Sequence, residues 1–202
     1  MAADDFRASA SGLNLQSQKP ISDGKDDVGG TGHKNRHAKP LRRRIRVLPP
    51  ENLSPETAKV ACDILDAAAF LVQVAGPLAR AKLNDLLYFA QAWHLVWDHE
   101  LLFRDAILAT EDGVSIAAID RLGGGAFTVE PRHVRKGRAD RLGESQQRTL
   151  LGIVKFYSGR NHYRLSEQIR QETPWRQARQ AAALGSTPTV EPAALHRYYR
   201  ES

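Results

Sequence analysis

The chain has 202 residues, a formal net charge of +6 at pH 7 and a single cysteine. This length is enough for one domain with its own core, and one cysteine excludes both a disulfide framework and a structural zinc site of several thiolates. The sequence shows neither a secretory leader nor a run of about 18 apolar residues, so we expect a soluble, cytoplasmic protein without membrane contact.

The positive charge is concentrated in the first quarter of the chain. Residues 1–50 contain ten Lys/Arg and five Asp/Glu, whereas residues 51–202 contain nineteen and eighteen. This distribution argues against a nucleic-acid-binding core, which would carry the charge on the fold. Residues 1–50, rich in Gly, Ser and charged side chains, are predicted to form a disordered basic arm. Its run Leu41–Arg46 is either a solvated tail or a weak contact to nucleic acid or to an acidic protein surface.

The first predicted helix follows the arm. Residues 54–56 (Ser-Pro-Glu) have the pattern of a helix start, with serine as N-cap and proline at the first helical position. The helix is expected to run to about Val74 and to end at Gly76, before a proline. Cys62 on this helix is interpreted as a small core residue.

The stretch Lys82–Trp97 is the one around which we expect the rest of the chain to pack. Its apolar residues recur at spacings of three and four and cover nearly the whole helix surface. Only Asn84, Asp85 and Gln91 interrupt that surface. A helix that is apolar nearly all round is typical of a central element with neighbours on several sides.

Short elements are expected between the central helix and residue 143. They are a polar turn at 98–100, an extended segment at 101–109, a short helix at 113–122, a glycine turn at 123–125 and a second short strand at 127–129. The loop Arg132–Arg141 carries five Lys/Arg residues against Asp140. It is either a solvated loop or a contact to a partner's carboxylates or to a phosphate backbone.

The last third of the chain is predicted to be helical. Amphipathic patterns favour helices at 144–158, 163–171 and 173–183, the last of them beginning with threonine as N-cap and proline at the first helical position. Residues 185–192 form a Pro/Thr linker, and 192–199 form a terminal helix or a mobile tail.

No residue pattern indicates catalysis or metal binding. His94 and His99 are five residues apart, which does not suit a helical zinc site, and His94 is interpreted as a core histidine with one hydrogen bond. His33 and His37 have the right spacing but lie in the arm. Neither a phosphate-binding glycine loop nor a Gly-x-Ser-x-Gly elbow is found in the sequence. We therefore predict that the protein is not an enzyme, with no catalytic residue, cofactor or metal ligand.

Two stretches far apart in the chain resemble one family. The first is Lys82–His94, with the pattern K-L-x-x-L-L-Y-F-A-Q-A-W-H, and the second is Leu165–Glu167 followed by Glu172–Arg179. In order and separation they resemble the signature helix and the closing motif of the Panacea antitoxin domain, a family also catalogued as phage-associated proteins. The resemblance covers roughly Pro55–Ala183.

The helical patterns and the resemblance together predict a fold and a set of site residues. The expected fold is mainly α, a single compact helical domain at residues 51–184 with two short strands, between the arm at 1–50 and the tail at 185–202. The motif residues expected in the core are Leu83, Leu86, Leu87, Tyr88, Phe89, Ala90, Trp93, His94, Pro174 and Trp175. The residues expected to bind a partner are Arg170, Glu172, Arg176 and Arg179. For Glu172 a structural role at the start of the following helix is the alternative.

Three places depart from the family pattern. Thr110 stands where the family has tryptophan, Val114 where it has proline, and Ile169-Arg170 where it has Thr-His. If these positions contact the partner in the family, this protein has a different partner or has lost the activity.

The function that the resemblance implies is neutralisation of a toxin encoded next to this protein, by direct protein–protein binding. One alternative is a nucleic-acid-associated regulator or phage-related protein that uses the arm and the Arg132–Arg141 loop. Another is an adaptor that presents a partner to another protein. A hydrolase-like enzyme is disfavoured, because no catalytic constellation is visible in the sequence.

Overall fold

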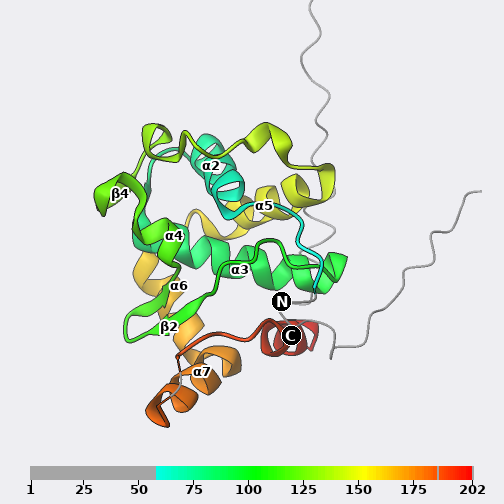
Figure 1. The fold of residues 1–202 in the computed structure, drawn as a ribbon, viewed down its shortest axis with the longest axis vertical. Helices are drawn as coiled ribbons and strands as arrows, with labels where there is room; N and C mark the ends of the chain where they lie inside the picture. The colour runs from blue at the N-terminus through cyan, green and yellow to red at the C-terminus, as the bar shows by residue number, and fades with distance from the viewer. Residues whose placement is uncertain (1–57, 186, 202) are drawn as a thin grey trace, which may run out of the picture.

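The computed structural model describes residues 58–185 and 187–201, and these residues form a mainly helical fold, as predicted (Figure 1). The predicted basic arm and the predicted helix start at 54–56 lie outside the described residues. The elements in chain order are α2 (Ile64–Ala75), β1 (Leu78–Ala79), α3 (Arg80–Asp98), β2 (Leu108–Thr110), β3 (Gly113–Ser115), α4 (Ala117–Asp120), η2 (Leu122–Gly124), β4 (Thr128–Val129), η3 (Pro131–Val134), η4 (Ala139–Arg141), α5 (Glu144–Tyr157), α6 (His162–Gln171), α7 (Thr173–Ala183) and α8 (Pro192–Arg200).

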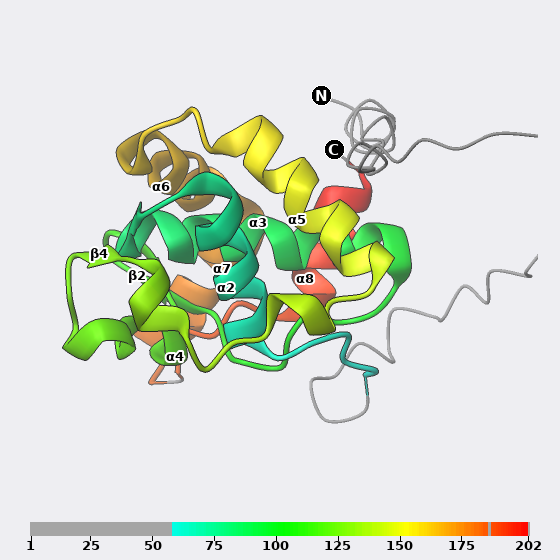
Figure 2. The same cartoon turned by 90° about the horizontal axis from the view of Figure 1, so that it is seen from above.

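Helix α3 runs through the middle of the molecule, as its apolar surface predicts. Every residue from Leu83 to Leu95 is buried. Helices α2 and α5 cover one side of α3, and α7 and α8 lie on the other (Figure 1). Figure 2 looks down on the side that α2 and α5 cover. A helix buried on all sides needs apolar residues around its whole circumference, which explains the composition of this stretch.

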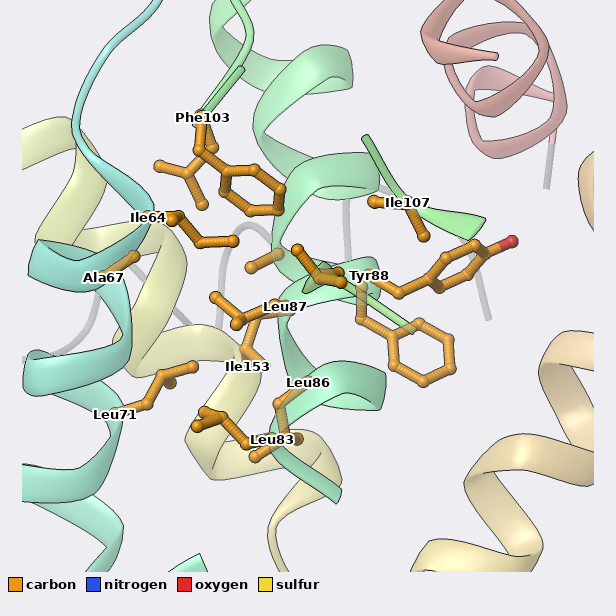
Figure 3. Packing of buried hydrophobic residues seen from close by; sticks show 14 of the residues in the cluster. Ile64, Ala67, Leu71, Leu83, Leu86, Leu87, Tyr88, Phe103, Ile107 and Ile153 are labelled. Atoms are coloured by element: carbon orange, nitrogen blue, oxygen red, sulfur yellow. The ribbon is translucent and has the colours of Figure 1, made fainter. Parts of the chain in front are cut away.

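The apolar core lies between α2, α3 and α5. Leu83 and Leu87 of α3 face Leu71 of α2 and Ile153 of α5, and all four side chains are fully buried (Figure 3). Tyr88, the next residue along α3, points to the opposite side of the helix. Each such leucine or isoleucine contributes about 1.5–3 kcal/mol through burial, so this layer fixes how α2 and α5 sit on α3.

The helix predicted to begin at residue 54 is absent from residues 58–63, and α2 begins at Ile64 instead. Residues 60–62 pair with the chain that follows α3, through Ala61 N–H to the carbonyl of Leu101 (2.8 Å) and a parallel bridge at Val60. Asp63 then caps α2 by accepting a hydrogen bond from the backbone N–H of Leu65 at 2.7 Å. The prediction was wrong here because a distant partner segment supplies the backbone hydrogen bonds.

The helix predicted at 113–122 is also wrong over most of its length. Residues 113–115 form β3, which pairs antiparallel with β2, and only 117–120 are α-helical. Gly113 has φ +139°, and a Cβ atom there would lie 2.9 Å from Oγ of Ser166 on α6. The strand is therefore selected by close packing on a residue more than 50 positions away. A second antiparallel pair joins β1 to β4, so the short strands number four in the described residues rather than two.

The C-terminal elements follow the predicted boundaries closely. Helices α5, α6 and α7 begin and end within one residue of the predicted positions. The last segment forms helix α8, which packs on α3 with Leu195 and Tyr199 buried. The rings of Tyr199 and Trp93 meet edge to face, with centroids 5.2 Å apart. In the part of the chain that the structure describes, no helix has the length and apolar character needed to cross a membrane.

Candidate functional site

The three polar residues that interrupt the surface of α3 are all buried. Gln91 has a structural role: its Oε1 accepts hydrogen bonds from the backbone N–H groups of Leu102 (3.0 Å) and Phe103 (3.2 Å), which hold the chain that follows α3. Asn84 and Asp85, one turn from the start of the helix, lead instead into two polar networks on the same side of the molecule.

Asp85 is the centre of the first network. Its carboxylate accepts hydrogen bonds from Oγ of Ser166 (3.1 and 3.2 Å) and lies 2.9 Å from Nδ1 of His162, both on α6. The Asp85 side chain is only 1% exposed, whereas that of His162 is 27% exposed. Burial raises the pKa of Asp85 to about 6, although the hydrogen bonds from His162 and Ser166 and the charge of His162 act to lower it. The carboxylate is therefore mostly ionised at pH 7.

This Ser–His–Asp group does not have the geometry of a catalytic triad. A triad needs the serine on Nε2 and the aspartate on Nδ1 of the histidine. Here Ser166 Oγ lies 3.0 Å from His162 Nδ1, the same nitrogen that faces Asp85. Because a carboxylate only accepts, Nδ1 carries a proton that points to Asp85. The sequence analysis did not single out His162 or Ser166 for chemistry.

Asn84 begins the second network. Its Nδ2 donates to Oδ1 of Asp120 at 2.9 Å, and Ser115 Oγ donates to the other oxygen of Asp120 at 2.5 Å. Arg80 donates to the carbonyl of Ala126 at 2.9 Å, and its Nε lies 3.9 Å from Asp120 Oδ1. The Oδ1 of Asn84 is buried and has no hydrogen-bond partner among the described residues. Such an atom is costly to leave unpaired.

Both networks border one pocket, which we call the α3–α6 pocket. It has a volume of about 530 Å³, within the range of ligand sites in proteins. Its wall comes from α3, the β2–β3 hairpin, α4, the segment before β4, and α6. The lining residues are Arg80, Ala81, Asn84, Thr110, Asp112, Val114, Ser115, Asp120, Phe127, His162, Tyr163, Ser166 and Arg170. Phe127 and Tyr163 are each 79% exposed, which is unusual for large aromatic side chains.

A third polar cluster lies in the core and joins the two sequence motifs. Tyr88 of the first motif donates to Glu172 of the second at 2.6 Å, and Tyr199 of α8 donates to both carboxylate oxygens at 2.8 and 2.9 Å. Burial raises the pKa of Glu172 to about 7, while hydrogen bonds from Tyr88, Tyr199 and Gln168 act to lower it. The same burial raises the pKa of both tyrosines well above the usual value.

The expected partner-binding role of Glu172 is wrong, because the side chain is 3% exposed. Its expected alternative, a hydrogen bond to the start of the next helix, is also absent: Glu172 is the N-cap of α7 but its side chain makes no cap bond. The carboxylate instead accepts hydrogen bonds from the hydroxyls of Tyr88 and Tyr199. Glu172 is thus a core residue that links α3, α7 and α8.

The expected core residues lie where the motif interpretation places them, with one exception. Leu83, Leu86, Leu87, Tyr88, Phe89, Ala90, Trp93, His94 and Pro174 are buried. His94 lies 3.2 Å from both Thr149 Oγ1 and Asp98 Oδ2 through Nδ1, as a core histidine would. Trp175 is only half-buried, and its Nε1 donates to the carbonyl of Gly113 at 2.7 Å, which ties α7 to the β2–β3 hairpin.

The three candidate arginines do not form one patch. Arg170 lines the α3–α6 pocket and reaches the carbonyl of Glu111 at 3.5 Å. Arg179 is half-buried against the same hairpin, 3.8 Å from the Glu111 carboxylate. Arg176 is exposed. Of the departures from the family pattern, Thr110 and Val114 line the pocket beside Arg170, whereas Ile169 is fully buried.

No protein-family model, curated protein or solved structure matches this chain. The resemblance to the Panacea antitoxin domain therefore stays a prediction from the two motifs.

The candidate metal ligands and the single cysteine of the described residues are placed as follows. Among them, no group of three or more His, Cys, Asp or Glu side chains is placed to hold a metal ion. Cys62 is half-buried and donates from Sγ to the carbonyl of Leu102 at 3.2 Å, and burial raises the pKa of its thiol to about 12. Such a thiol is unreactive at neutral pH.

The Arg132–Arg141 loop is largely exposed. Two of its cations already have acidic partners, Arg132 with Glu130 (3.0 Å) and Arg138 with Asp140 (2.8 Å). A backbone contact anchors it, because Asp66 of α2 accepts from the N–H of Arg138 at 2.6 Å.

Proposed function

We propose that this protein is antitoxin-like and neutralises a toxin encoded next to it by direct protein–protein binding. The family resemblance was inferred from two motifs. The observation that supports the proposal most strongly is that these two motifs contact each other in the fold. Tyr88 and Asp85 of the first motif bond to Glu172 and Ser166 of the second. Motif residues from opposite ends of a domain that contact one another behave as one structural unit.

The face around the α3–α6 pocket is the surface best suited to such a partner. It presents two exposed aromatic rings, Phe127 and Tyr163, beside the exposed Arg170. Tyrosine and arginine are enriched among the residues that carry most of the binding energy in protein interfaces. A standard interface buries about 1,600 Å² in total, so the partner would extend from the pocket over the neighbouring hairpin and α6.

Co-expression tests the proposal. The product of the neighbouring gene alone should arrest growth, and this protein should restore growth and co-purify with that product. Phe127→Ala combined with Tyr163→Ala should weaken both the rescue and the complex while leaving the thermal melting temperature unchanged. Leu184→Ala, at an exposed large apolar residue that follows α7 and lies outside the pocket, is the matched control and should have no effect.

The result that would overturn the proposal is a harmless neighbouring gene product, or rescue without a physical complex. Rescue by a complex that survives the Phe127/Tyr163 double variant would keep the function but move the interface elsewhere. Arg176→Glu would then be the next variant, since Arg176 is the exposed arginine on α7 outside the pocket.

A second candidate is nucleic-acid contact through the basic loop. The observation that favours it is the exposure of Arg135, Lys136 and Arg141, which form no salt bridge within the described residues. Such contacts would act by charge and carry no sequence information.

A further inference from the structure

We infer that the α3–α6 pocket binds a cationic N–H donor, the guanidinium or ammonium end of an arginine or lysine side chain. The first observation is that the polar side chains of the pocket donate most of their hydrogen bonds to acceptors within the fold. Ten charged or polar side chains line it on α3, the hairpin, α4 and α6, and most of the donors among them already have acceptors.

The buried carboxylates fix the orientation of the neighbouring side chains. Because Asp120 can only accept, the Nδ2 group of Asn84 must face it, and Oδ1 of Asn84 is left as the free atom. In the same way Asp85 holds the Nδ1 proton of His162. The hydroxyl protons of Ser115 and Ser166 are also directed to carboxylates. What remains at the pocket wall is therefore rich in acceptors.

Asn84 gives the second, independent sign of a ligand. It is 3% exposed and lines the pocket, and its Oδ1 lacks any hydrogen-bond donor among the described residues. Buried polar atoms in proteins nearly always have a partner, so an orphan at a pocket wall indicates one that comes from outside. A donor entering beside Asp120 would supply the missing hydrogen bond.

The charges also favour a cation. Asp112 and Asp120 line the pocket together with Arg80 and Arg170, and the buried carboxylate of Asp85 lies directly behind His162 and Ser166. Arg80 is held by the Ala126 carbonyl and Asp120. Asp112 is exposed and makes no ion pair within the described residues, so its carboxylate is available.

The aromatic rim suits the same ligand. The rings of Phe127 and Tyr163 are largely exposed at the mouth of the pocket. Aromatic faces attract guanidinium and ammonium groups and pack against the methylenes that carry them. Arg170 is the one rim group that opposes a cation, and this makes its substitution diagnostic.

The test uses L-argininamide as the probe and L-citrullinamide as its neutral counterpart, followed by amide chemical shifts of the full chain. Argininamide should shift signals from the hairpin and from the start of α6, with saturation in the millimolar range, and citrullinamide should not. Asp112→Asn should weaken argininamide binding at least threefold. Glu167→Gln, an exposed acid of α6 outside the pocket, is the control and should leave it unchanged.

Arg170→Gln decides the sign of the ligand charge. It should tighten argininamide binding at least twofold, because it removes the opposing cation. If instead Arg170→Gln weakens binding of inorganic phosphate and argininamide does not bind, the pocket is an anion site and the inference is wrong. Equal binding of argininamide and citrullinamide would also overturn it.

We favour a protein partner as the source of the cation, and this part of the inference rests on the proposed function. Saturating argininamide should then release the neighbouring gene product from the complex. Argininamide that binds without competing would keep the ligand class and reject the partner as its source. Growth rescue in the co-expression test does not depend on the probe, so the two proposals fail separately.

Discussion

Glu172 is a carboxylate buried between two tyrosine hydroxyls, and its protonation is coupled to folding. Burial raises its pKa to about 7 from an ordinary value near 4.5, so between these values the folded state holds a proton that the unfolded state has lost. The free energy of unfolding must therefore decrease as pH rises from about 4.5 to about 7. A shift of this size corresponds to about 3 kcal/mol. Asp85, with its pKa raised to about 6, contributes with the same sign.

The first prediction is that Glu172→Gln flattens this pH dependence. Glutamine resembles the protonated acid and does not titrate, so the variant should be at least as stable as the natural protein at pH 7. Urea unfolding at intervals from pH 4.5 to 8 is the measurement. Glu167→Gln, on the exposed side of α6, should keep the natural slope. An unchanged slope in Glu172→Gln would show that the carboxyl titrates normally in the fold.

The two motif tryptophans should differ in their contribution to stability. Trp93 is 3% exposed and contacts Tyr199 and Trp97, so Trp93→Ala should destabilise by about 3–5 kcal/mol. Trp175 is half-buried at the edge of the core, so Trp175→Ala removes less packing together with the hydrogen bond to Gly113 and should cost about 1–2 kcal/mol. Urea unfolding compares them. Equal losses, or a smaller loss for Trp93, would contradict this ranking.

At the scale of elements, α8 is a part of the core and not a tail. Pro192, Leu195 and Tyr199 are buried, and the Tyr199 hydroxyl helps to satisfy Glu172. Truncation after Gly185 should therefore destabilise by about 4 kcal/mol or more, since two large buried side chains and a hydrogen bond to a buried carboxylate are lost.

Deletion of residues 1–47 is the matched comparison. The composition of this segment predicts that its deletion causes no loss of stability. The melting temperatures of the two truncated proteins, compared with that of the full chain, test both expectations. A truncation after Gly185 that melts like the full chain would contradict the structural role of α8. A loss of several degrees on deletion of residues 1–47 would show that the arm contributes to folding.

The elements that the sequence predicted well are those whose pattern is local. Helices α5, α6 and α7 have clear amphipathic stripes and start signals, such as Pro174 in the first turn of α7, and their bounds agreed closely. The start of α2 and the β2–β3 hairpin were mispredicted because pairing at Leu101 and close packing at Gly113 decide them. The conformational propensities of neighbouring residues carry no information about contacts between residues so far apart in the sequence.

The candidate pocket was only partly visible in the sequence for the same reason. Asn84 and Asp85 could be recognised as unusual, because they interrupt an otherwise apolar helix. Their partners on α4 and α6 lie 36 to 81 residues further along and carry no pattern of their own. A polar residue in a central helix therefore signals that a partner exists, but only the fold identifies it.

At the scale of the whole molecule, the charge is divided between an arm with a net charge of +5 and a remainder with +1. The exposed cations of the Arg132–Arg141 loop are partly neutralised by Glu130 and Asp140. Contacts of lysine and arginine with phosphates release counterions, so binding that depends on them weakens steeply with added salt. We therefore predict weak, sequence-independent DNA binding that is lost at physiological ionic strength.

Fluorescence anisotropy with two unrelated labelled duplexes, over a range of salt from about 20 to 200 mM, checks this prediction. Deletion of residues 1–47 should remove most of the binding, because the arm carries most of the net charge. Arg135→Glu combined with Lys136→Glu should remove part of the remainder, and Arg197→Glu on α8 should have less effect. Tight retention of one duplex over the other at physiological salt would contradict the prediction. It would favour the regulator over the antitoxin-like function, because selective readout requires contacts to base edges that charge alone does not supply.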